Sequence, residues 1–263
     1  MNPVAEERLP HSIGGLTDLA LAAYATRFPL YAALAAFSLA LQAAAEWTFP
    51  SRTDALNVAS IVGDALVVAA VAIGVARYAA NCAHPDDRVR EAAATEPDET
   101  ADAPLLQAAL RRWFSAAGAL TIAWLIFATT YPASGFVAPA EPGAAMLMVL
   151  SAPATWLVWA AVALAAPLAS ILPDSPALAI FTGFARSIML ALRVRNLGRL
   201  CVLAFATIVP LLLEIVLTDV FQRRELPHAA FWANTPADAI VTGPLAALQT
   251  VFALDFTRRA NGR

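Results

Sequence analysis

Lysine is absent from this chain, and all 17 basic residues are arginine. Without a lysine amine, the protein cannot hold retinal or pyridoxal phosphate as a Schiff base. A phosphate-binding loop that ends in Gly-Lys-Ser or Gly-Lys-Thr is excluded for the same reason. We therefore expect neither a lysine-linked cofactor nor an ATP-hydrolysing subunit.

Residues that ligate metals are also scarce. The chain has two cysteines and three histidines, and no pair of them has the spacing of a zinc site. All three histidines lie outside the long apolar segments, so a haem held between membrane histidines has no ligands. We expect no metal and no other cofactor. The residues concerned are Cys82, Cys201, His11, His84 and His228.

Motifs of common enzymes are missing as well. There is no Gly-x-Ser-x-Gly nucleophile elbow. The adjacent Asp86 and Asp87 lack the glycine-flanked helical context that metal-dependent phosphotransfer on lipid head groups needs. The sequence therefore predicts a protein that is not an enzyme, and nothing in it favours binding to nucleic acid.

Apolar residues, by contrast, make up 60% of the chain, against about 45–50% in soluble domains. They form runs of about 20 residues, which match a hydrocarbon core of roughly 30 Å. We expect residues 1–263 to form a single all-α integral membrane domain, a polytopic bundle of six transmembrane helices. The expected spans cover about residues 28–47, 55–78, 114–131, 145–171, 200–221 and 237–256.

The arginines orient this bundle. Fourteen lie on one side of the six-span arrangement, and only Arg52, Arg223 and Arg224 lie on the other. Because basic residues are enriched in cytoplasmic loops, we expect a bacterial inner-membrane protein with both termini on the cytoplasmic side.

The segments between the spans differ in kind. Residues 84–104 contain seven acidic residues and few large apolar ones, a composition typical of a disordered cytoplasmic linker. Residues 13–27 and 178–195 are too short or too charged to cross, so we expect amphipathic helices in the membrane interface. Leu105 to Arg112 is a shorter candidate of the same type.

An internal repeat would explain why three cytoplasmic approaches look alike. Arg27, Arg112 and Arg195 stand at similar positions, each before a span that leads outward. Either the chain repeats a unit of interfacial helix, outward span and return span, or any three approaches from the cytoplasm would carry arginine there. Both interpretations stay open.

A carboxyl group stands near the middle of the second span. Asn57, Ser60 and Asp64 occur at i, i+3 and i+7 and share one helix face. A carboxylate at the bilayer centre costs about 3 kcal/mol on insertion scales. We therefore expect this face to point into the bundle.

Two further polar groups could join Asp64. Glu214 in span five lies at a depth compatible with contact, and Gln249 in span six could act as a neutral ligand. One interpretation is a proton or cation site built from these groups. The other is that they form hydrogen bonds between helices and fix the packing.

The segments 12–34, SIGGLTDLALAAYATRFPLYAAL, and 184–213, FARSIMLALRVRNLGRLCVLAFATIVPLLL, carry a family resemblance. They resemble the membrane domain of the glycerophosphoryl diester phosphodiesterase membrane-domain family and the YciC-type six-span proteins. The resemblance covers the membrane part only. It implies a six-span fold with basic, aromatic approaches to the bilayer, and it implies no catalytic domain, substrate or cofactor.

From these observations we predict a non-enzymatic inner-membrane protein, a scaffold or accessory subunit of a membrane complex or envelope process. The alternative is a small transporter or permease subunit with an intramembrane carboxylate site at Asp64 and Glu214. Expected partners are membrane lipids, with other membrane subunits or further copies of the chain as additional candidates.

Overall fold

The computed structural model describes residues 9–10, 12–50, 52–81, 102–130, 142–191, 193–207 and 228–260, with the single residues 217, 220 and 224. Every regular element within these ranges is helical, which confirms the all-α prediction. The elements are α2 (Ile13–Ala25), α3 (Phe28–Thr48), α4 (Thr53–Asn81), α6 (Asp102–Thr130), α7 (Pro142–Ala163), α8 (Ala165–Ile171), α9 (Pro176–Ala191), η3 (Val194–Asn196), the helix Leu197–Thr207 and α11 (Ala229–Ala260).

Within the described residues, five helical stretches are long and apolar enough to cross a membrane. They correspond to the first, second, third, fourth and sixth expected spans. Of the fifth, 200–221, the described part is helical through Thr207, and most of the remainder lies outside the described residues. The stretches are Phe28–Thr48, Asp54–Asn81, Asp102–Thr130, Ala152–Ile171 and Ala239–Ala260.

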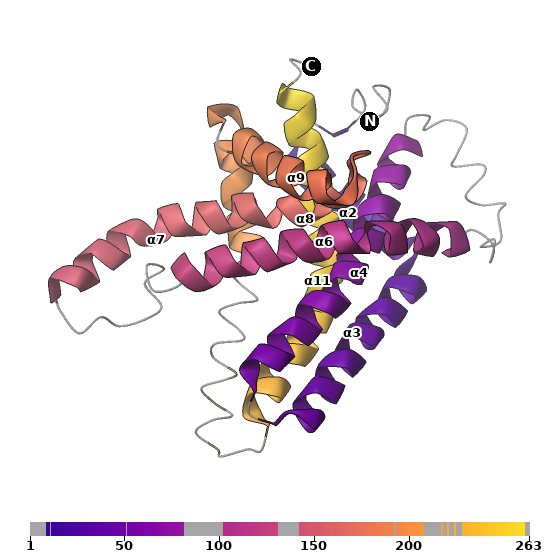
Figure 1. Ribbon diagram of the computed structural model, residues 1–263. Coiled ribbons are helices and arrows are strands. Elements are labelled where there is room, and N and C mark those ends of the chain that lie inside the picture. Colours follow the sequence, from indigo (N-terminus) through magenta and orange to yellow (C-terminus); the bar gives the residue numbers. More distant parts are fainter. Residues whose placement is uncertain are drawn as a thin grey trace.

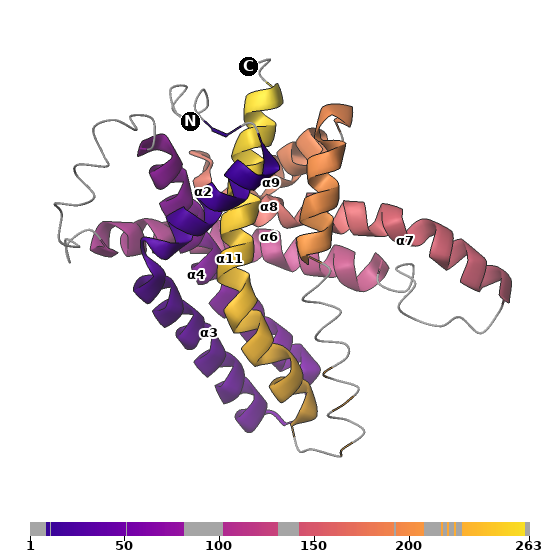
Figure 2. The ribbon, with the colours of Figure 1, turned by 180° about the vertical axis from the view of Figure 1, so that it is seen from behind.

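The long helices form two groups that run in different directions (Figure 1). Helices α3, α4 and α11 lie together, whereas α6 and α7 run at a steep angle to them and extend to one side. Figure 2 shows the same divergence from behind, with α2, α8 and α9 gathered where the groups meet. The C-terminal end of α11 lies next to Leu9, and Arg258 of α11 donates a hydrogen bond to the Leu9 carbonyl.

Proline explains two of the helix boundaries. Pro29 stands in the first turn of α3, where a backbone N–H would have no partner within the helix. A new helix therefore begins here, and α2 and α3 are separate. Pro167 cannot donate to the Ala163 carbonyl, and α7 ends at that residue. Leu164 N instead donates to Ala161 O over 3.3 Å. The fourth span is therefore broken near Pro167, as expected of a kinked helix.

The prediction of a separate helix at Leu105 to Arg112 is wrong, because α6 is continuous from Asp102 to Thr130. Because α6 begins at Asp102, the last three residues of the expected linker 84–104 belong to this helix. Pro104 falls in the first turn, where proline is tolerated. The carboxylate of Asp102 in the same turn stabilises the helix through its interaction with the positive end of the helix dipole.

The other expected interfacial segments do form their own helices. α2 covers most of 13–27, and α9 with η3 covers most of 178–195. Only the first and third of the three expected approaches therefore have a separate helix, so the second approach departs from the proposed repeat.

Small residues set the closest helix contacts. A Cβ on Gly63 of α4 would collide with Ser38 of α3. A Cβ on Gly183 of α9 would approach the backbone of Ala165 and Ala169 in α8. Such close approach is typical of helices that associate in a membrane, where packing replaces the hydrophobic effect between helices.

Candidate functional site

Asp64 is buried between α3 and α4, with 8% of its surface exposed. Ser38 Oγ of α3 donates to Asp64 Oδ1 over 2.6 Å, and Ser60 Oγ of α4 donates to Oδ2 over 2.7 Å. Both distances lie within the usual range for O–H···O hydrogen bonds, about 2.5–3.0 Å. Both carboxylate oxygens are thus held in place.

A second polar side chain extends this network along α3. Gln42 Nε2 donates to Ser38 Oγ over 3.2 Å, and both side chains are fully or almost fully buried. Neither Ser38 nor Gln42 is among the site residues predicted from the sequence. The signal was present, since Ser38 and Gln42 are an i, i+4 polar pair in an otherwise apolar span.

Asp64 also borders a cavity of about 340 Å³ between the two groups of helices. Ser60 and Asp64 come from α4, while Thr242 and Gln249 come from α11. The remaining walls are largely apolar and aromatic. The other lining residues are Ile61, Val68, Leu120, Ala123, Trp124, Phe127, Trp159, Val162, Ala163, Thr207, Val241 and Leu245.

The structure therefore brings together three of the five predicted site residues, namely Ser60, Asp64 and Gln249. Asn57 lies on the same helix, α4, but does not line the cavity. Glu214 lies outside the described residues.

A hydrogen bond fixes the aromatic wall of this cavity. Trp159 Nε1 of α7 donates to Thr130 Oγ1 of α6 over 2.7 Å, and the ring centroids of Trp159 and Phe127 are 4.5 Å apart. These contacts join α6 to α7. The two helices therefore carry the aromatic wall together.

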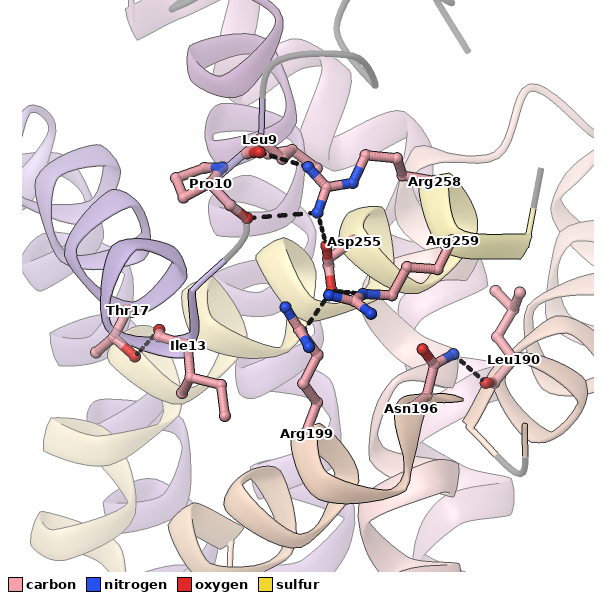
Figure 3. Close-up of polar contacts among 10 residues, drawn as sticks. All are labelled: Leu9, Pro10, Ile13, Thr17, Leu190, Asn196, Arg199, Asp255, Arg258 and Arg259. Atoms are coloured by element: carbon pink, nitrogen blue, oxygen red, sulfur yellow. Dashed lines mark hydrogen bonds and ion pairs between the residues drawn. The ribbon is translucent and has the colours of Figure 1, made fainter. Parts of the chain in front are cut away.

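A different polar cluster surrounds Asp255 at the end of α11 (Figure 3). This carboxylate is completely buried. Arg199 Nε and Arg259 Nε each reach Asp255 Oδ2, over 2.8 Å and 2.9 Å. Arg258, also buried, pairs with Oδ1. One carboxylate thus faces three guanidinium groups.

The same cluster holds the N-terminal segment. Arg258 donates to the carbonyls of Leu9 and Pro10, the latter over 3.4 Å (Figure 3). Arg199, Arg258 and Arg259 are among the fourteen arginines that predict the orientation, and none of them is a site residue predicted from the sequence. The i, i+3 and i+4 spacing from Asp255 was a visible signal for two of the pairs.

At the opposite end of α11, His228 joins α3. Its Nδ1 lies 2.7 Å from Glu46 Oε1, and its ring stacks on Trp47 with centroids 5.3 Å apart. Phe231 also packs on Trp47, edge to face. These contacts close the α3–α11 pair at the end away from Asp255.

Among the residues that the structure describes, no group of three or more histidine, cysteine, aspartate or glutamate side chains could hold a metal ion.

Comparison with protein-family models, with curated proteins and with solved structures finds no match for this chain.

Proposed function

We propose that this protein is a non-enzymatic, multi-pass inner-membrane transporter or permease subunit that binds an organic cation at Asp64. A single observation carries the proposal: a carboxylate buried within a membrane-length helix forms part of the wall of an apolar cavity. An ionisable residue inside a membrane domain is costly to insert, and such residues commonly mark substrate or ion pathways.

Asp64 presents a carboxylate to a ligand in this cavity. Its two oxygens also accept hydrogen bonds from Ser38 and Ser60, which fix its position. An ammonium group in the cavity would lie beside this carboxylate within largely apolar walls, where opposite charges attract more strongly than in water. Thr242 and Gln249 stand in the same wall as further polar groups.

The other walls favour an organic cation over a metal ion. Trp124, Phe127 and Trp159 line the cavity, and aromatic faces attract cations within about 6 Å of the ring centroid. A hard metal ion would require six or more oxygen ligands. The expected substrate class is therefore an amine or quaternary ammonium compound with an apolar body.

The arrangement of helices provides a physical basis for access. The cavity lies between α4 and α11 on one side and α6 and α7 on the other, and these groups diverge in Figures 1 and 2. A change in the angle between them would open or close the cavity, as rocking of one helix group against another does in transporters.

The test is uptake of a lipophilic cation, tetraphenylphosphonium, into proteoliposomes. We expect saturable uptake by the wild type and its loss in Asp64→Asn. Asp18→Asn removes the same charge from an exposed position on α2 and serves as the matched control. Unchanged uptake in Asp64→Asn, or uptake no greater than in protein-free vesicles for the wild type, would contradict the proposal.

A scaffold or accessory subunit is the second candidate, and the contact of Ser38 with Asp64 favours it. This bond joins α3 to α4 beside the close approach at Gly63, so the carboxylate could serve packing alone. In that case Asp64→Asn lowers thermal stability, the wild type shows no saturable uptake, and the protein co-purifies with a membrane partner.

A further inference from the structure

A second and larger cavity, about 640 Å³ in volume, lies between α4, α6 and α8. None of the residues that the structure describes lines both this cavity and the cavity at Asp64. Three arginines and a majority of small or apolar side chains form its walls. The lining residues are Leu9, Ile73, Ala76, Arg77, Ala79, Ala80, Pro104, Gln107, Ala108, Arg111, Arg112, Ser170, Ile171 and Leu254.

Helix periodicity places the arginines next to apolar surface. On α4, Ile73 and Ala80 share the face of Arg77 at spacings of four and three residues. On α6, Pro104, Gln107 and Ala108 precede Arg111 in the same way. The two faces meet around one hollow, so positive charge and apolar wall belong to the same site.

The charged side chains that line this cavity, among the residues that the structure describes, are all arginines. Arg77 and Arg111 are exposed and form no ion pair with any residue that the structure describes. Each guanidinium carries five N–H donors, the groups that bind an anionic ligand.

Arg112 is held by the protein itself. Its Nη1 donates to the Asp174 carbonyl over 2.7 Å, which leaves other N–H groups of the five on a guanidinium. Arginine favours phosphate because its planar fork donates two parallel bonds to the phosphate oxygens. An oriented guanidinium beside two exposed ones fits a phosphate ester.

We propose that this cavity binds an anionic phospholipid, with the head-group phosphate at Arg77, Arg111 and Arg112 and an acyl chain along the apolar wall. The apolar wall decides between the two sources of phosphate, because inorganic phosphate would gain nothing from it, whereas an acyl chain would bury it. All three arginines are among the fourteen that orient the protein, so the lipid belongs to the cytoplasmic leaflet. Basic pockets between helices at this level are suited to such head groups.

The experiment measures lipid retention by native mass spectrometry, together with thermal stability, for protein in detergent supplied with phosphatidylglycerol or phosphatidylcholine. We expect the wild type to retain phosphatidylglycerol and to be stabilised by it, and phosphatidylcholine to have little effect. Arg77→Gln combined with Arg111→Gln should weaken retention by about tenfold or more, since each lost charge-assisted bond is worth a large part of that factor.

The matched control combines Arg186→Gln with Arg195→Gln. These side chains are also exposed and are expected on the same side, but they do not line the cavity. This double variant removes the same net charge as the variant of Arg77 and Arg111, and its lipid retention should stay at the wild-type level. Equal loss in both double variants would overturn the proposal in favour of general attraction to a basic surface.

A cavity-filling variant, Ala108→Phe, keeps all three arginines and should also reduce retention. It provides a test that remains valid if the double arginine variant fails to fold. A third arm adds inorganic phosphate in place of lipid. Stabilisation by phosphate equal to that by phosphatidylglycerol, or unchanged lipid retention in Ala108→Phe, would overturn the assignment to a phospholipid.

Discussion

Ser38 on α3 donates a hydrogen bond to Asp64 on α4, with 2.6 Å between the two oxygens. The contact joins consecutive membrane-length helices through a carboxylate that also borders a cavity. It makes Asp64 both a packing contact and a candidate binding group, and the two roles can be separated by experiment.

Ser38→Ala should destabilise the protein without removing the charge at Asp64. A hydrogen bond to a charged group contributes about 1.5–3 kcal/mol, and no solvent replaces the lost donor because Ser38 is fully buried. The measurement is the free energy of unfolding by titration with a denaturing detergent. Thr121→Ala, at an exposed position whose hydroxyl donates to Ala117 of its own helix, should have a much smaller effect. Equal effects of the two substitutions would contradict the assigned role of Ser38.

Gly63→Ala should weaken the contact between α3 and α4. Its Cβ would collide with Ser38, including its backbone, and overpacking of this kind costs about 1–3 kcal/mol. The same unfolding titration measures the loss. Gly14→Ala is the matched control, because nothing lies within 4 Å of that position, and no loss is expected there. If Gly63→Ala leaves the free energy of unfolding unchanged, the close approach of α3 and α4 at this position does not contribute to stability.

Asp255→Ala should be among the most destabilising single substitutions. It leaves the buried Arg258 without its carboxylate, and removing one partner of a buried pair costs about 3–5 kcal/mol. Asp54→Asn is the control, since Asp54 and Arg52 form an exposed pair and such pairs contribute little. A double-mutant cycle between Arg199 and Asp255 measures their coupling directly. Additive effects in that cycle would show that the ion pair contributes nothing to stability.

Membrane orientation can be tested with cysteine labelling. In a background with Cys82 and Cys201 replaced by serine, we expect Arg52→Cys to react with an impermeant maleimide in intact cells. Arg186→Cys should react only after the membrane is opened, because the arginine distribution places it in the cytoplasm. Both side chains are exposed. The reverse pattern would invert the topology, and labelling of both in intact cells would place them on one side.

The resemblance to the phosphodiesterase membrane-domain family stays a prediction, and it assigns no functional role to any residue of either cavity.

The site itself was predictable in part. Ser60 and Asp64 share a face by helix periodicity alone, whereas their neighbours on α3 and α11 depend on which helices are adjacent. Hydropathy gives little information about adjacency, because lipid is as apolar as a neighbouring helix.

The sequence by itself determined the all-α class, five of the membrane-length helices and the presence of a polar face on the second, since each depends on local periodicity and length. Only the tertiary structure decided that Ser38 is the partner of Asp64, that Arg199 joins Asp255, and that three arginines line one cavity. Such groupings join residues from different helices. Their physical basis is the close approach of small side chains and the pairing of charges between helices.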